Sequence, residues 1–238
     1  MSALQILSGG AAQGLVGSLA AELKTRTGFD IAGEFGAVGL MADKLRAGAA
    51  ADILILTSAL ITALADENLV DRASVKDVGR VETALAVRTI DPLVSAPDAE
   101  SLRAAFLAAD AIFVPDTKAS TAGIHVAKVL GRLGIADEVA HCLKIYPNGA
   151  TAMRHMAESS AARPLGCTQA TEIIATNGIK LSGALPKGCD LATVYTAVAT
   201  KAVHAREAKA LIDLLTSADQ RALRQRAGFL PIQGAAHD

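Results

Sequence analysis

The sequence is poor in the residues on which several classes of protein depend. Only 3% of its 238 residues are aromatic and none is tryptophan, so a surface that stacks the bases of single-stranded nucleic acid is not expected. The formal net charge is −1 and no cluster of lysine and arginine occurs, which argues against binding of a phosphate backbone. We therefore expect no nucleic acid among the partners of this chain.

Cysteine is scarce as well. Cys142, Cys167 and Cys189 lack the close spacing of metal ligands, and their odd number argues against a disulfide framework. His125 and His155 lie in helical patterns, and we recognise no set of metal ligands around His141, His204 or His237. We expect reduced thiols, no metal site and no cofactor.

A secretory leader and a long apolar run are also missing. Strand-like sequence begins at Leu4, with no basic segment and no long apolar segment before it. The longest apolar stretch, Ala47 to Ala65, is interrupted by Asp52. We expect no membrane span and a cytoplasmic location; a chain whose leader had been trimmed would be periplasmic.

What the sequence does contain is a regular alternation of strand-like and helical patterns, which is typical of βα units around parallel sheets. The continuously apolar run from Ala51 to Thr57 is typical of a strand that is covered on both faces. The predicted strands are Gln5–Leu7, Asp30–Phe35, Ala51–Thr57, Val81–Arg88, Ala111–Val114, Leu143–Tyr146, Arg163–Gln169, Ile179–Leu185 and Asp190–Thr200. The predicted helices are Ala12–Thr27, Leu40–Ala47, Ser58–Glu67, Ala99–Ala108, Ser120–Leu133, one opening at Asn148, one from Ala170, and a broken one over Ala205–Arg226.

Two long β segments, Val81–Arg88 and Ala192–Thr200, divide the chain into a first part, a middle part and a return. Two lobes joined by these segments would hold a ligand in a cleft and close on it by hinge motion. Residues 1–84 and 195–238 would then form lobe 1, and residues 85–194 would form lobe 2. A single doubly wound sheet explains the pattern equally well.

Small residues occupy four of the corners at which a strand passes into a helix. The first-turn amides of a helix have no partner within it and carry partial positive charge, and ligands bind at the carboxyl ends of parallel strands. Helix capping explains any one corner, but four together favour a site for a small, multiply charged anion. The first corner lacks the spacing of a dinucleotide-binding glycine loop. The corners are Ser8-Gly9-Gly10, Gly36-Ala37-Val38-Gly39, Ser120-Thr121-Ala122-Gly123 and Asn148-Gly149-Ala150-Thr151.

Four further side chains are candidates for the site. Arg88 ends a buried-looking strand; a surface position beside a loop is its commoner role, but a guanidinium group also suits a bidentate clamp for a ligand carboxylate. Thr168 and Gln169 follow another strand, and Gln169 is a candidate hydrogen-bond partner of the ligand. Glu172 is a candidate cap of the next helix, near its positive end.

Taken in order, these segments resemble the periplasmic molybdate-binding protein family, which has the type 2 periplasmic binding fold. The resemblance implies an α/β protein of two lobes, two crossing strands and an anion-binding cleft. The family's first serine corner matches Ser8-Gly9, but its second, usually a serine pair, is Ala37-Val38 here, and its late valine-tyrosine pair is replaced by Thr168-Gln169. These departures imply a ligand other than molybdate. The matching segments are "SGG", "GAVG", "AGAAADILILTSALITALADENLV", "VETALAVR", "STAGIHVAKVLGRLGI", "PNGATAMRHMA", "RPLGCTQATEI" and "GIKLSGALP".

A branch of this family that includes aconitate isomerase is similar in "SGG", in the strand that ends at Arg88 and in the pattern of Gly166–Glu172. That similarity implies a di- or tricarboxylate ligand, neutralised by Arg88 and the helix N-termini. One interpretation is a binding protein that performs no chemistry, with an ABC permease as partner only if it is exported. The alternatives are a cytoplasmic isomerase, with Glu172 or less readily Ser8 as the catalytic group, and a molybdate or other oxyanion receptor of an ABC transporter.

Overall fold

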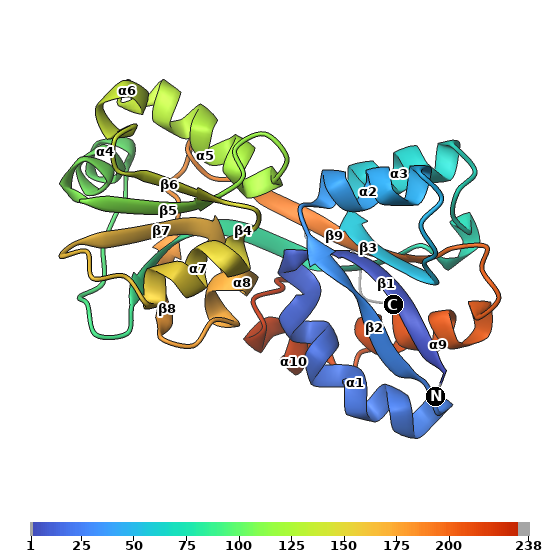
Figure 1. Cartoon of the computed structure of the whole chain (residues 1–238). Coiled ribbons are helices and arrows are strands. Elements are labelled where there is room, and N and C mark those ends of the chain that lie inside the picture. The colour runs from blue at the N-terminus through green and yellow to red at the C-terminus, as the bar shows by residue number, and fades with distance from the viewer. Residues whose placement is uncertain (1, 233–238) are drawn as a thin grey trace. The chain divides into compact units, whose positions relative to one another are not determined.

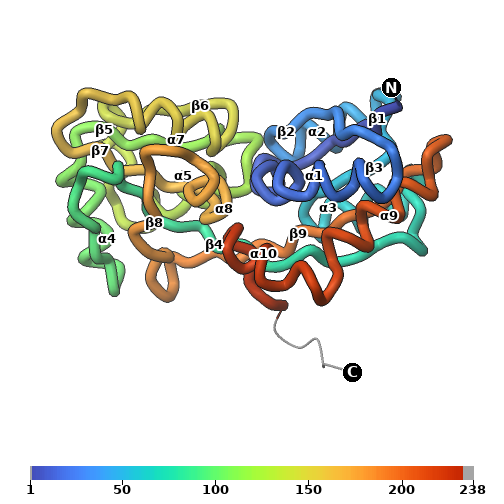
Figure 2. The backbone as a smooth tube through the Cα atoms, turned by 90° about the horizontal axis from the view of Figure 1, so that it is seen from below, coloured from blue at the N-terminus to red at the C-terminus, as the bar shows by residue number. Residues whose placement is uncertain are grey.

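The computed structural model describes residues 2–232, and the chain divides into two compact units. Unit 1 comprises Met1–Val81 and Thr193–Asp238, and unit 2 comprises Glu82–Ala192. The chain leaves unit 1 within the long strand β4 (Lys76–Arg88) and returns at the start of β9 (Ala192–Ala199). These two strands are hydrogen-bonded neighbours, and both can be followed in Figures 1 and 2.

Unit 1 is built on the strands β1 (Ala3–Gly9), β2 (Asp30–Gly36) and β3 (Ile53–Thr57). β1 runs parallel to both β2 and β3, and β9 runs antiparallel to β3. Four successive residues of β3, Ile53 to Leu56, are completely buried, so both faces of this strand are covered. Figure 1 shows α1 (Gln13–Thr27) and α9 (Ala205–Thr216) on one face, and α2 (Val38–Arg46) and α3 (Ser58–Asp66) on the other.

Three short helices complete unit 1. The 3-10 helix η1 (Gly10–Ala12) leads from β1 into α1, and η2 (Arg72–Ser74) precedes β4. Near the end of the described chain, α10 (Arg221–Arg226) follows α9 after a short break. The broken terminal helix predicted for Ala205–Arg226 is therefore two helices.

Unit 2 repeats this plan around β5 (Ala111–Pro115), β6 (Leu143–Tyr146) and β7 (Pro164–Gln169). β5 lies between β6 and β7 and runs parallel to both. β4 runs antiparallel to β7, and β8 (Ile179–Ala184) runs antiparallel to β4. The helices of this unit are α4 (Ala99–Ala108), α5 (Thr121–Arg132), α6 (Ala136–Val139), α7 (Gly149–Ala157) and α8 (Ala170–Ile174).

The three cysteines belong to the hydrophobic core of unit 2. Cys142, Cys167 and Cys189 are free thiols, and they pack with side chains such as Leu102 and Phe106. Burial raises the pKa of the Cys167 thiol to about 12, so this group stays protonated and unreactive at neutral pH. These cysteines are packing residues.

The structure confirms the predicted α/β class and adds details that the pattern missed. β4 begins at Lys76 rather than Val81, and α6 was not predicted. Across residues 2–232 no helix combines the length and the apolar character needed to span a bilayer.

Candidate functional site

In unit 1, three helices begin at the carboxyl ends of the parallel strands without any side-chain cap. Their N-cap residues, Gly9, Ala37 and Thr57, have extended backbones, and none of their side chains accepts a hydrogen bond from the first turn. Because β1, β2 and β3 are parallel, these helix starts share one edge of the sheet. A methyl group placed on Gly9 would lie only 2.8 Å from Cγ1 of Val38. The first two predicted corners, which also include Gly10 and Gly36, therefore meet within unit 1.

Ser8 is placed differently from the prediction. The residue has no exposed surface, and its hydroxyl group lies 2.9 Å from the Gly9 carbonyl oxygen and 3.3 Å from that of Ile55, to which it can donate. A hydroxyl has one proton, and here it is directed at backbone carbonyls. The expected role of Ser8 in ligand binding or catalysis stays a prediction.

In unit 2 the corresponding edge carries the starts of α5, α7 and α8. Ser120 precedes α5 and Gln169 precedes α8; both are extended and neither caps its helix. α7 differs, because the Asn148 side chain accepts a hydrogen bond of 2.8 Å from the Thr151 amide. The predicted corner residues Ser120 and Thr121 thus lie at the uncapped start of α5. The start of α7, on the same edge, is capped by Asn148.

The start of α7 is also covered by a carboxyl group of the protein itself. A Cβ atom built on Gly149 would lie 1.9 Å from Oε2 of Glu172 and 2.0 Å from Oγ1 of Thr168, so only glycine fits there. Thr168 donates a hydrogen bond of 2.6 Å to the same carboxyl oxygen. The amides of Gly149 and Ala150 also point to the Glu172 carboxyl. The amides of Gly149 and Ala150 therefore hold an internal acid, and direct ligand binding by these two residues stays a prediction.

Burial dominates the electrostatics of Glu172. The side chain is almost completely buried, and desolvation raises the pKa of its carboxyl group above the ordinary value. The hydrogen bonds from Thr168 and from the amides of Gly149 and Ala150 favour the ionised form, but they only partly offset this effect. The carboxyl group therefore keeps its proton to a higher pH than a solvated glutamate does.

Gln169, which stands beside this buried acid, has an unsatisfied side chain. It is 3% exposed, and neither its Nε2 nor its Oε1 atom has a hydrogen-bond partner among the described residues. Thr83 of β4 lies opposite Gln169 in the β4–β7 strand pair. Its buried hydroxyl group also has no hydrogen-bond partner within residues 2–232. Buried polar groups are nearly always paired in proteins, so these unpaired side-chain atoms make this part of unit 2 a candidate binding site.

Arg88 does not belong to this edge. β4 runs antiparallel to β7, so Arg88 lies five residues beyond Thr83, or about 17 Å toward the opposite edge of the sheet. Its Nε and Nη2 atoms donate to the two carboxylate oxygens of Asp91 at 2.6 and 3.1 Å, and its Nη1 atom donates to the Ser159 carbonyl at 2.6 Å. In this structure the guanidinium group holds an internal carboxylate, and the expected clamp of a ligand carboxylate by Arg88 stays a prediction.

Sequence reasoning missed two residues of these edges. Thr57 is the N-cap residue of α3, the third helix of unit 1 that begins without a side-chain cap. The end of the apolar strand at Thr57-Ser58 could have indicated this helix start. Thr83 lies in the middle of an apolar strand, and only the register against Gln169 shows its relevance. For residues 2–232, no cluster of three or more histidine, cysteine or acidic side chains is suited to a metal ion.

Comparison with known proteins identifies relatives of this chain and of its fold. The chain is 24% identical over 244 residues to an aconitate isomerase from Pseudomonas sp.. The match covers 98% of this chain and 89% of that protein. Its fold is similar to that of the periplasmic molybdate-binding protein of Azotobacter vinelandii (TM-score 0.81, 17% identity, 97% of this chain and 100% of the other). It is also similar to the sulfate-binding protein of Mycobacterium tuberculosis (TM-score 0.68, 17% identity, covering 99% of this chain and 88% of the other).

These neighbours share the type 2 periplasmic binding fold, which is therefore the fold of this chain. A family model described as bacterial extracellular solute-binding protein matches residues 4–230. The match covers nearly every described residue, including both sets of uncapped helix starts and the buried pair Gln169 and Glu172. The chain thus belongs to the bacterial extracellular solute-binding protein family.

Proposed function

We propose that this protein binds a small di- or tricarboxylic acid, and that the side-chain amide of Gln169 is one of the groups that bind it. The observation that carries this proposal is the buried, unpaired amide of Gln169 at an uncapped helix start. Leaving such a group unpaired costs about 1–3 kcal/mol. A carboxylate oxygen that accepts from Nε2 would remove this cost.

The donors that remain free favour a carboxylate over a tetrahedral oxyanion. The second corner of unit 1 offers Ala37 and Val38, which have no hydroxyl groups, and the Ser8 hydroxyl is directed at backbone carbonyls. The amide N–H groups of the uncapped helix starts remain, together with the hydroxyl groups of Thr57, Ser120 and Thr121, and a planar carboxylate accepts two such donors at once. The name of the aconitate isomerase relative, which matches 98% of this chain, also points to a tricarboxylic acid.

A second candidate function is isomerisation of such an acid, and Glu172 favours it. A 1,3-proton shift requires a group that removes a proton from one carbon and returns it to another as the double bond moves between them. A buried carboxyl group whose pKa is raised suits this exchange, and uncapped helix starts would stabilise the enolate-like charge that develops. The isomerase relative supports this candidate. In this case Glu172 is the proposed base.

The experiment is a ligand panel followed by thermal unfolding. We expect citrate, cis-aconitate or trans-aconitate to stabilise the protein by about 2.7 kcal/mol at a concentration a hundred times its dissociation constant, which corresponds to about 5–10 °C in melting temperature. Molybdate, tungstate and sulfate should give no shift. Stabilisation by the oxyanions alone would refute the carboxylate proposal and support an oxyanion receptor that works with an ABC permease.

The same samples distinguish binding from catalysis. Proton NMR in D₂O would detect conversion of one aconitate isomer into the other, together with incorporation of deuterium at the carbon that receives the proton. If Glu172 is the base, Glu172→Gln should bind the acid and fail to convert it. Stabilisation without conversion by the parent protein would leave binding as its function and exclude the isomerase.

A further inference from the structure

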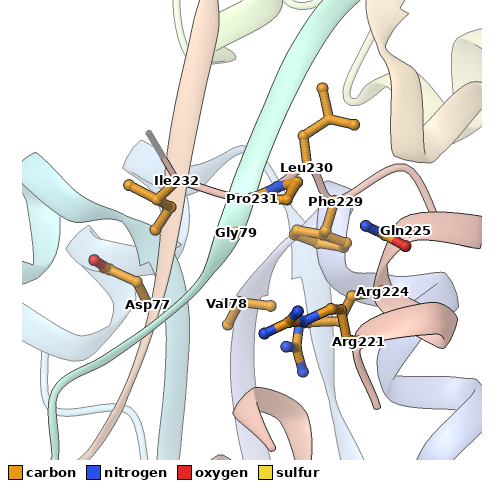
Figure 3. Close-up of a pocket in the computed structure, with 10 residues that line it drawn as sticks. All are labelled: Asp77, Val78, Gly79, Arg221, Arg224, Gln225, Phe229, Leu230, Pro231 and Ile232. Carbon is orange, nitrogen blue, oxygen red and sulfur yellow. The ribbon is translucent and has the colours of Figure 1, made fainter. Parts of the chain in front are cut away.

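Unit 1 contains a pocket of about 400 Å³ that is separate from the helix starts described above. It lies where α10 and the segment that follows it pass over the first residues of β4 (Figure 3). This volume is in the range that holds small organic ligands. Its lining residues are Asp77, Val78, Gly79, Arg221, Arg224, Gln225, Phe229, Leu230, Pro231 and Ile232.

The apolar part of the pocket is held in place by the backbone. Arg80 and Leu230 exchange backbone hydrogen bonds of 2.9 and 2.8 Å, which join the segment after α10 to β4. Phe229 is 2% exposed, and its ring packs edge-to-face on Tyr195 with 6.3 Å between the ring centroids. The apolar wall is therefore preformed, and a ligand would not need to order it.

The polar end of the pocket carries two positive charges. Arg221 and Arg224 are three residues apart on α10, and Figure 3 shows both guanidinium groups at one end of the pocket, with Asp77 at the other. Nη1 of Arg224 donates to the carbonyls of Leu215 and Ser217 at 2.9 and 2.7 Å. Over residues 2–232 neither arginine forms an ion pair with an acidic side chain.

The nearest acid in the lining does not neutralise these charges. The Asp77 carboxylate accepts a hydrogen bond of 2.6 Å from the Thr196 hydroxyl, on the far side of the pocket. Burial lowers the pKa of Arg224, and the like charge of Arg221 lowers it further by repulsion. An anion at this end of the pocket would relieve that repulsion and accept several charge-assisted hydrogen bonds.

We propose that this pocket is a second binding site, for an organic carboxylate with an apolar body. The carboxylate group lies against Arg221 and Arg224, and the apolar body packs on Phe229, Val78 and Ile232. This ligand class differs from the small polycarboxylates of the Gln169 site, because the larger part of this pocket is apolar and preformed.

The test uses 4-fluorobenzoate and its neutral analogue 4-fluorobenzamide, with binding followed by ¹⁹F NMR and by the methyl signals of Val78, Leu230 and Ile232. We expect 4-fluorobenzoate to shift these methyl signals and 4-fluorobenzamide to bind at least about tenfold more weakly. Arg221→Gln should weaken 4-fluorobenzoate binding about tenfold, whereas Arg221→Lys should retain part of it. Arg226→Gln, which changes an exposed arginine of the same helix outside the pocket lining, is the matched control.

Three results would overturn the proposal. The first is equal affinity for the acid and the amide, and the second is equal binding by the Arg221→Gln and Arg226→Gln variants. The third is the absence of methyl shifts at this pocket up to about 10 mM 4-fluorobenzoate. Since Gln169→Leu leaves this pocket unchanged, that variant should bind 4-fluorobenzoate like the parent, so this proposal and the proposed function can fail separately.

Discussion

Replacing Gly123 by alanine is expected to destabilise the protein by about 3 kcal/mol or more. Gly123 is a buried residue in the first turn of α5, and a Cβ atom there would lie 2.1 Å from the Asp116 carbonyl oxygen and 2.5 Å from that of Pro115. Both atoms belong to the backbone that leads out of β5, so neither can move without displacing the start of α5. Urea unfolding with an unchanged m-value would measure the loss.

Gly131→Ala is the matched control, because it makes the same change near the end of the same helix. No atom lies within 4 Å of the added Cβ there, and alanine favours a helix over glycine by up to about 1 kcal/mol. This variant should equal or exceed the parent in stability. If the two variants behaved alike, the close contact between the first turn of α5 and the end of β5 would be disproved.

Replacing Glu172 by glutamine is expected to change how stability depends on pH. The folded state raises the pKa of this carboxyl group, so between the ordinary value of about 4.5 and the raised value the folded protein binds more protons than the unfolded chain. The stability contributed by Glu172 is therefore complete below the ordinary pKa and falls as pH rises through the folded pKa. As pH rises, the parent should lose about 1.4 kcal/mol of unfolding free energy, relative to Glu172→Gln, for each unit by which folding raises the pKa.

The measurement is urea unfolding of both proteins from pH 4 to pH 8. Glu158→Gln, which changes an exposed glutamate at the end of α7, should leave the pH profile unchanged and serves as the control. A stability difference between the parent and Glu172→Gln that stays constant, or that grows in favour of the parent with increasing pH, would contradict the burial of a neutral carboxyl group.

Sequence patterns predicted the fold well because most elements are local and strongly periodic. The apolar run that ends at Thr57 and the helix Ala99–Ala108 were recognised from their own residues. The first residues of β4 were missed because exposed Lys76 and Asp77 carry no apolar signal, and their strand conformation comes from pairing with a neighbour. α6 has only four residues, which is too short for a periodic pattern.

The helix starts of the candidate site could be predicted from the sequence, but the partners of its side chains could not. Glycine and small residues at strand ends indicated the uncapped helix starts, since that signal is local. The internal partners of Ser8 and Arg88 were not predicted, because the partner of a polar side chain depends on strand direction and tertiary contacts. The covering of Gly149 by Glu172 is likewise a tertiary contact that no local motif reveals.

The most direct test of the central claim is calorimetry of citrate and cis-aconitate binding to the parent and to Gln169→Leu, together with the stability of the unliganded proteins. A leucine removes the buried, unpaired amide at similar volume, so the free variant should be as stable as the parent or more stable, and its affinity should fall at least about tenfold. Asn177→Ala, which removes an exposed side-chain amide of the same unit, should match the parent in both properties. A Gln169→Leu protein that binds these acids as the parent does, or that is strongly destabilised without them, would contradict the assignment of Gln169 to the ligand.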